Sequence, residues 1–132
     1  MTPAIQWAQA PDKVFLDIKF AHRFDAPGCI EIRTDKIDFQ SSHLKISATC
    51  TMSSHQMRYV VDWDLYDEVD MDACSYNMSS LGRMTVTLEK KVKAYWKLPM
   101  KGKKPGNMQM WWELKAKYKK DMKSYYPSDG TS

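Results

Sequence analysis

Apolar and polar side chains alternate along most of the first 90 residues of this chain. In the segment 13–20, the apolar residues Val14, Leu16, Ile18 and Phe20 are separated by mostly polar neighbours. Successive side chains of a β-strand point to opposite faces, so this period of two predicts a strand with one buried face. The same pattern predicts further strands near residues 5–7, 30–33, 37–39, 44–50, 59–65 and 84–89.

Turn-forming residues separate the seven predicted strands, and no long helical pattern lies between them. Pro11–Asp12, Thr34–Asp35 and Ser41–Ser42 provide short turns, and the stretch 70–82 provides a longer loop. Many short strands with regular turns are typical of an antiparallel β-sandwich or barrel. Periodicity alone does not separate these two all-β folds.

The character of the chain changes after Trp96. Residues 99–106 are a basic loop containing Pro and Gly, and residues 107–126 are predicted to form one amphipathic helix. The predicted apolar stripe of this helix consists of Trp111, Leu114, Tyr118, Met122 and Tyr125, spaced three or four residues apart. Residues 127–132 are predicted to be a disordered tail.

The composition is that of a single domain with a packed core. The chain has 132 residues, of which 43% are hydrophobic and 12% aromatic. No apolar run is long enough to span a membrane, and no leader pattern is visible at the start. Cys29, Cys50 and Cys74 are widely spaced and form no CxxC pair. We therefore expect reduced thiols in a cytoplasmic or nuclear protein rather than a disulfide framework.

The two parts of the chain carry opposite charge. Residues 1–86 hold 8 Lys and Arg against 12 Asp and Glu, whereas residues 87–132 hold 12 against 4. A basic end on an acidic body indicates an interaction surface for an acidic partner. Nucleic acid is one such partner, but the aromatic residues of the predicted helix lie on a different face from most of the lysines. We therefore interpret the lysines as a solvated face.

No group of residues points to catalysis, to a metal or to a cofactor. His22, His43 and His55 lie at predicted strand ends or turns, without Cys or His at ligand spacing. The acidic run 62–72 lacks the Gly and Glu that a calcium-binding EF-hand loop needs, so we interpret it as a solvated loop. A Gly-rich phosphate loop and a nucleophile elbow are also missing from the sequence. These features predict a binding protein rather than an enzyme.

Three segments resemble the CS domain family. They are Trp7–Ala8–Gln9 with Val14–Phe15–Leu16, the segment 59–66, and the segment 83–91 followed by Tyr95–Trp96 and Leu98. Their order and spacing are similar to those of CS domains over residues 4–98. Within the family they resemble the twenty-three-kilodalton co-chaperones of heat-shock protein 90. The resemblance implies a seven-stranded antiparallel β-sandwich of immunoglobulin-like layout in residues 1–98, ahead of the basic loop and the helix.

The resemblance also implies a function. Such co-chaperones bind the closed, ATP-bound state of heat-shock protein 90 and slow its ATP turnover. By that analogy, the partner-binding residues are Lys90, Lys91, Trp96, Met110, Trp111 and Trp112. Lysines would meet acidic rims of the chaperone, and aromatic or Met side chains would fill apolar pockets. For Trp96, a role in the core remains an equal alternative, and for the whole chain the alternative is a scaffold adaptor of another multiprotein complex.

The chain departs from the co-chaperone pattern at two places. The segment after the sandwich is basic, whereas the co-chaperones carry an acidic tail, so client holding by such a tail is not expected here. Ala8 follows the first Trp where the co-chaperones have Tyr. This difference argues against carrying over the prostaglandin synthase activity that has been attributed to them.

Overall fold

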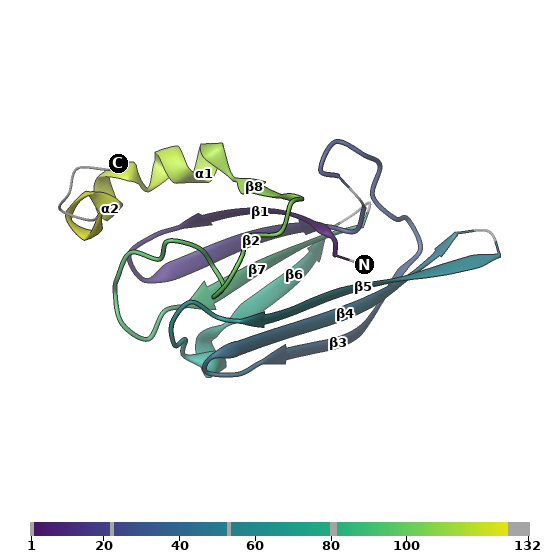
Figure 1. Cartoon of the computed structure of the whole chain (residues 1–132), viewed down its shortest axis with the longest axis horizontal. Coiled ribbons are helices and arrows are strands. Elements are labelled where there is room, and N and C mark those ends of the chain that lie inside the picture. Colours follow the sequence, from purple (N-terminus) through teal and green to yellow (C-terminus); the bar gives the residue numbers. More distant parts are fainter. Residues whose placement is uncertain (1, 22, 53, 80–81, 127–132) are drawn as a thin grey trace.

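Two β-sheets pack face to face in the computed structural model of this chain, which describes residues 2–21, 23–52, 54–79 and 82–126 (Figure 1). The first sheet has the order β6 (Ser75–Ser79), β7 (Arg83–Glu89), β2 (Lys13–Lys19), β1 (Ala4–Gln9) and β8 (Met108–Met110). The second sheet is a meander of β3 (Ile32–Phe39), β4 (His43–Met52) and β5 (His55–Asp64). All neighbouring strands are antiparallel except β1 and β8, which are parallel. The predicted β-sandwich is therefore confirmed.

The core lies between the two sheets and is built from the alternating positions. Leu16 and Ile18 on β2 are fully buried, as are Leu44 and Ile46 on β4. Burying one such side chain contributes about 1.5–3 kcal/mol relative to leaving it in water, so the inward residues of the two sheets hold the sandwich together. This is why the period of two was visible in the sequence.

The described residues form eight strands, and these differ from the seven predicted strands in three places. The two predicted strands at 30–33 and 37–39 are one strand, β3, because the predicted turn at Thr34–Asp35 is a register shift between Thr34 and Lys36. Strand β6 lies in the stretch interpreted as a loop. Strand β8 replaces the start of the predicted helix, because Met108–Met110 pair with Ile5–Trp7.

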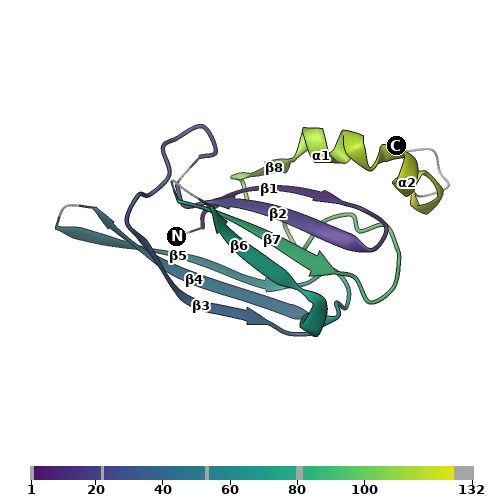
Figure 2. The same ribbon diagram turned by 180° about the vertical axis from the view of Figure 1, so that it is seen from behind.

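The C-terminal segment is helical over a shorter range than predicted. Helix α1 spans Trp112–Lys117 and α2 spans Lys119–Met122, followed by a 3-10 turn at Lys123–Tyr125. Both views show this segment lying over β1 (Figures 1 and 2). The ring of Tyr118 stacks on Phe15 of β2, with ring centroids 5.3 Å apart. Phe15 faces away from the core, so it holds the helices on the outer face of the first sheet. The predicted tail, 127–132, lies outside the described residues.

A disulfide joins Cys29 to Cys50, which corrects the expectation of reduced thiols. The bond ties the connection between β2 and β3 to strand β4, and both cysteines are buried. The connection also packs against the start of β7, where a Cβ on Gly82 would clash with the backbone of Cys29. Gly82 has φ 69°, a conformation that favours glycine. Sequence spacing did not indicate this pair, because only the fold brings residues 21 positions apart together.

Candidate partner-binding face

Two of the predicted contact residues, Lys90 and Trp96, lie inside the protein. Their relative exposures are 5% and 1%. Gln9 at the end of β1 connects them: its Nε2 donates to the Trp96 carbonyl at 2.7 Å, and the Trp96 N–H donates to its Oε1 at 2.9 Å. Their burial removes Lys90 and Trp96 from the surface that a partner can reach.

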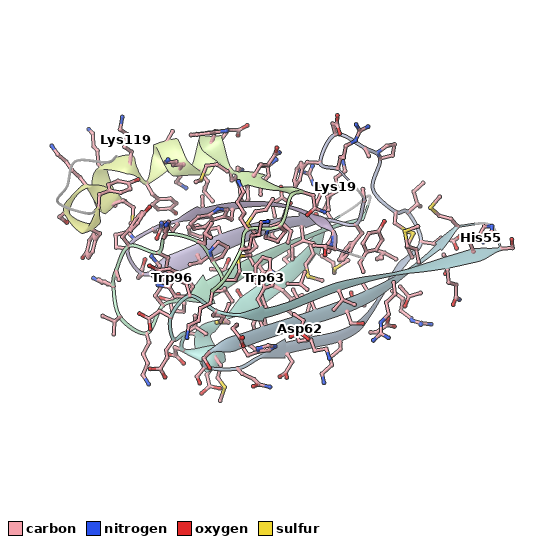
Figure 3. All side chains as sticks on the ribbon, in the orientation of Figure 1. Lys19, His55, Asp62, Trp63, Trp96 and Lys119 are labelled. Atoms are coloured by element: carbon pink, nitrogen blue, oxygen red, sulfur yellow. A yellow bond between two sulfur atoms is a disulfide. The ribbon has the colours of Figure 1, made fainter. Side chains whose placement is uncertain are left out.

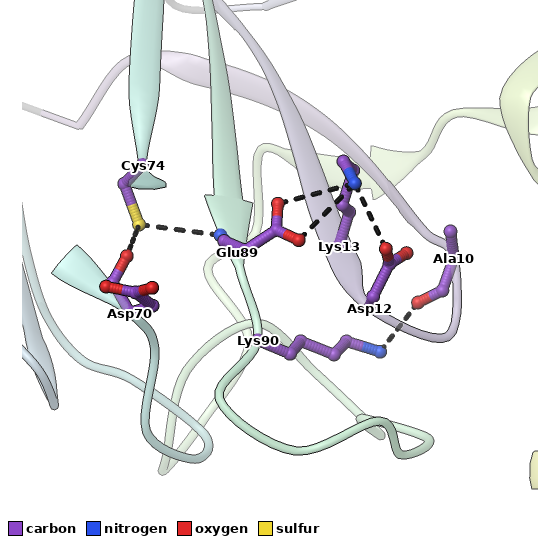
Figure 4. A network of polar contacts seen from close by, with 7 residues as sticks. All are labelled: Ala10, Asp12, Lys13, Asp70, Cys74, Glu89 and Lys90. Atoms are coloured by element: carbon purple, nitrogen blue, oxygen red, sulfur yellow. Dashed lines mark hydrogen bonds and ion pairs between the residues drawn. The ribbon is translucent and has the colours of Figure 1, made fainter. Parts of the chain in front are cut away.

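The side-chain ammonium of Lys90 donates hydrogen bonds to three oxygen atoms of the surrounding chain. Its Nζ donates to Gln9 Oε1 at 2.8 Å, to the Ala10 carbonyl at 2.9 Å and to the Ala94 carbonyl at 2.6 Å. The ammonium also lies 5.7 Å from the centroid of the Trp96 ring. Figure 4 shows the Lys90 side chain reaching back to Ala10, beside the ion pairs of Lys13 with Asp12 and Glu89. Lys90 therefore fastens the segment after β7 to the end of β1.

Burial lowers the pKa of Lys90 from 10.5 to about 8, and the carboxylate of Asp12 only partly offsets this effect. The unfolded chain keeps this proton up to about pH 10.5, whereas the folded protein releases it near pH 8. Between these values unfolding takes up a proton, so stability contributed by this group rises with pH. We expect the free energy of unfolding to gain about 1.5 kcal/mol from Lys90 between pH 8 and about pH 9.5.

Urea denaturation across this pH window measures the effect, with Lys90→Met as the matched variant. The variant keeps the length of the side chain and has no proton to exchange, so its stability should lack this rise. Equal slopes of stability against pH in both proteins would show that Lys90 has an ordinary pKa.

Lys91, in contrast, is exposed and faces a different part of the molecule. Its Nζ lies 3.9 Å from a carboxylate oxygen of Glu68, and its N–H donates to the Glu68 carbonyl at 3.1 Å. Lys91 therefore lies against the acidic loop that follows β5. Lys91 thus does not share one surface with Trp111 and Trp112.

Met110, Trp111 and Trp112 form a continuous segment that leaves the first sheet and starts the helix. Met110 is the last residue of β8 and is partly buried against the core. The N–H of Trp111 donates to the Trp7 carbonyl at 2.8 Å, which fixes the start of α1 on β1. Trp112 points outward, with 70% of its surface exposed. Of the three, Trp112 is the side chain most available to a partner.

Trp112 lies on a basic face whose residues were not predicted to lie together. It lines a shallow depression of about 330 Å³ together with Lys115, Ala116, Lys119 and Tyr126; we call these five residues the Trp112 face. Lys115 Nζ lies 5.1 Å from the centroid of the Trp112 ring. Figure 3 shows Lys119 at the helical end of the molecule, far from His55 at the tip of the β4–β5 hairpin. The spacing of residues 112, 115, 116 and 119 was a detectable signal, because it is the spacing of one helix face.

The predicted apolar stripe of the helix forms the opposite, inward side. Met122 is buried at 1% exposure, and Tyr118 stacks on Phe15. Trp111, Leu114 and Tyr125 are partly buried. The stripe therefore docks the helices, while Trp112 and the lysines remain outside. In the described part of the chain, no helix combines the length and apolar character needed to cross a membrane.

Comparison with known proteins identifies the family to which this fold belongs. A model of the CS domain family matches residues 3–90. The chain belongs to the CS domain family. A search of curated proteins found no match to its sequence.

Solved structures show the same CS fold. The solution structure of the CS domain of the human KIAA1068 protein is similar, with a TM-score of 0.54 and 11% sequence identity, covering 80% of this chain and 78% of that one. Heat shock protein 16.0 from Schizosaccharomyces pombe is similar with a TM-score of 0.50 and 19% identity, covering 78% of this chain and 76% of that one. CS domains are protein–protein interaction modules, and this chain shares their fold.

The second sheet of this CS domain carries a histidine between two aspartates on neighbouring strands. His43 on β4 contacts both Asp62 and Asp64 on β5, its Nδ1 lying 3.0 Å from Asp64 Oδ1. These bonds to Asp64 and Asp62 raise the pKa of His43. Among the described residues, no three His, Cys, Asp or Glu side chains are placed to hold a metal ion. The arrangement thus links the neighbouring strands β4 and β5.

Proposed function

We propose that this CS domain is a co-chaperone that binds the closed, ATP-bound state of heat-shock protein 90 and slows its ATP turnover. The Trp112 face is the proposed contact surface. The observation that carries this proposal is a 70% exposed tryptophan, flanked by lysines, on a helix that is docked on the sandwich. Tryptophan is among the residues that most often supply a large share of binding energy in protein interfaces.

The proposed binding combines an apolar anchor, Trp112, with the positive charges of neighbouring lysines. The Trp112 ring offers a large rigid surface, and Ala116 leaves room beside it for a partner side chain. Lys115 and Lys119 attract an acidic surface and accelerate the encounter, an effect that salt weakens. Because the helix is already held by Tyr118 on Phe15, binding does not require it to fold first.

The choice of heat-shock protein 90 as partner rests on the resemblance of residues 7–16, 59–66 and 83–98 to its co-chaperones. Lys90 and Trp96 are buried, and Lys91 lies against Glu68 in the acidic loop after β5. The proposed contact residues that remain from the sequence are therefore Met110, Trp111 and above all Trp112, which belongs to the Trp112 face. Such a partner also implies a cytoplasmic location, which is part of the proposal. The Cys29–Cys50 disulfide argues against that location, because disulfides are rare in cytosolic proteins.

Titration of the chaperone with this chain, in the presence of a non-hydrolysable ATP analogue, tests the proposal. We expect binding in that nucleotide state, and Trp112→Ala should weaken it by roughly 1–3 kcal/mol because the anchor is lost. The matched control is Met52→Ala, since Met52 is 61% exposed on the hairpin at the other end of the molecule. Its affinity should stay unchanged.

Three outcomes of this titration have different consequences. Absence of binding in the ATP state would overturn the chaperone proposal. Equal binding with and without nucleotide would favour the scaffold adaptor instead. Tight binding that Trp112→Ala leaves unaltered would place the contact surface elsewhere on the domain.

A further inference from the structure

Among the described residues, the two sheets have four edge strands: β6 and β8 in the first sheet, and β3 and β5 in the second. Three of these edge strands are protected against pairing with another chain. Strand β3 carries a register shift and the charged residues Arg33, Asp35, Lys36 and Asp38. Strand β5 carries the charged residues Arg58, Asp62 and Asp64, and the segment 99–101 covers its last residue, where the Lys101 N–H donates to the Asp64 carbonyl at 2.8 Å. Strand β8 is only three residues long. Charges, irregular pairing, covering segments and short length are the usual means of blocking a sheet edge.

Strand β6 has none of these protections. Its sequence, Ser75-Tyr76-Asn77-Met78-Ser79, contains no charge and no proline, and all five residues are exposed. It pairs with β7 in unbroken register and has no partner on its other side among the described residues. Figure 2 shows β6 as the outermost strand of the first sheet, beside β7. Its outer backbone groups are therefore available to another strand.

Apolar side chains gather along this same edge. Tyr76 is 50% exposed, Met78 is 38% exposed and Met71, just before the strand, is 49% exposed. They make up three of the eight large apolar side chains that are exposed in the described part of the chain. Tyr76 lies 6.4 Å from the Phe39 ring, and Met78 Sδ accepts from the Thr34 hydroxyl, so both reach across the seam between β6 and β3. A strand added at β6 would cover this seam.

We propose that β6 pairs antiparallel with β6 of a second copy of this chain, about a twofold axis at Asn77. The five residues are self-complementary in this register: Ser75 faces Ser79, Tyr76 faces Met78, and Asn77 faces itself. Each half of the interface thus receives one aromatic ring opposite one thioether, a favourable pair. Interfaces of this kind, with the same patch on both copies, are the commonest in homodimers.

The charges around β6 agree with antiparallel pairing. Asp70 and Asp72 precede Ser75 at one end of the strand, whereas Arg83 lies opposite Ser79 at the other end. Arg33 also lies at that second end, next to Thr34, which contacts Met78. Antiparallel pairing brings the acidic end of one copy to the basic end of the other. Parallel pairing would bring like charges together and would lose the Tyr76–Met78 match.

This dimer surface is independent of the Trp112 face. Strand β6 is the far edge of the first sheet from β8, where the helices begin. Pairing two β6 strands joins the two first sheets into one continuous sheet and leaves both Trp112 faces open. Because only five residues pair, the dimer is expected to be weak and dependent on protein concentration.

Cysteine cross-linking tests the register directly. Residues facing each other across an antiparallel pair have Cα atoms about 4.5–5.5 Å apart, within the range that a disulfide spans. Asn77→Cys lies on the proposed axis and should give a disulfide-linked dimer under mild oxidation. Ser75→Cys faces Ser79 of the second copy, so it should not cross-link with itself but should do so when mixed with a Ser79→Cys chain. All variants carry Cys74→Ser, so that the free thiol of Cys74 does not interfere.

Sedimentation equilibrium of the unmodified chain provides the second measurement. We expect a mass that rises from monomer to dimer with concentration, and a monomer at all concentrations for the double variant Tyr76→Lys and Met78→Lys. Trp112→Ala is the control and should dimerise like the unmodified chain. A monomeric mass throughout for the unmodified chain, or self-cross-linking of Ser75→Cys as rapid as that of Asn77→Cys, would overturn the proposal.

Discussion

Replacing Trp96 by alanine is expected to lower the free energy of unfolding by about 3–5 kcal/mol, because a large buried side chain leaves a cavity. Trp96 is 1% exposed, lies 5.9 Å from the Tyr66 ring and packs under the Lys90 ammonium. Its backbone is also bound to Gln9 at both its N–H and its carbonyl. Loss of the ring therefore loosens the segment that follows β7. Urea denaturation followed by circular dichroism measures the change.

Trp112→Ala is the matched control, since it removes the same side chain from a 70% exposed position. Its stability should change by less than about 1 kcal/mol, as is usual for surface substitutions. Trp96→Phe should fall between the two, because a smaller ring fills part of the space. If Trp96→Ala were as stable as Trp112→Ala, Trp96 would not be a core residue, and its interpretation as a partner contact would return.

Removal of the Cys29–Cys50 disulfide is expected to cost about 3 kcal/mol, from the loop-closure entropy of a cross-link between residues about 20 positions apart. The two cysteines are separated by 21 positions and hold the β2–β3 connection to β4. The double variant Cys29→Ser and Cys50→Ser removes the link without leaving a single reactive thiol. Urea denaturation with and without a reducing agent measures the same contribution in the unmodified chain.

Cys74→Ser is the control for this experiment, because Cys74 is a free cysteine. It should keep the response to reducing agent, whereas the double variant should lose it. A chain whose stability is unaffected by reduction would show that the cross-link contributes nothing. A chain that unfolds on reduction at body temperature would be unsuited to the cytosol and would count against the proposed location.

The strands with long alternating runs were predictable, and the short strands β6 and β8 were not. Leu44, Ile46 and Ala48 alternate on β4 because that face meets the other sheet. Strand β6 shows only Tyr76 and Met78 as an alternating pair, and both are partly in solvent. Alternation is weak evidence over so few residues, so the sequence predicts a loop where β6 lies. Strand β8 is three residues long and depends on pairing with β1, a partner about 100 positions earlier.

Only part of the candidate site was predictable, because burial depends on neighbours that are distant in the sequence. Trp112 was named from the sequence, but Lys90 and Trp96 were named with it and lie in the interior. A lysine after a strand normally reaches solvent, and only the folded chain shows three oxygen atoms gathered around Lys90 Nζ. Phe15, in contrast, was informative in the sequence. It is an apolar residue at an outward position of β2, where polar residues are expected, and the helices pack on it through Tyr118.

The amino-acid sequence alone determined that this chain is a β-sandwich of the CS domain family with a basic, tryptophan-bearing C-terminal segment. Those properties depend on local alternation, composition and the order of short motifs, which are all visible along the chain. Tertiary structure decided which tryptophan is exposed, which lysine is buried, which cysteines are joined and which sheet edge is open. Each of these depends on contacts between residues far apart in sequence, because burial and pairing are properties of neighbours in space.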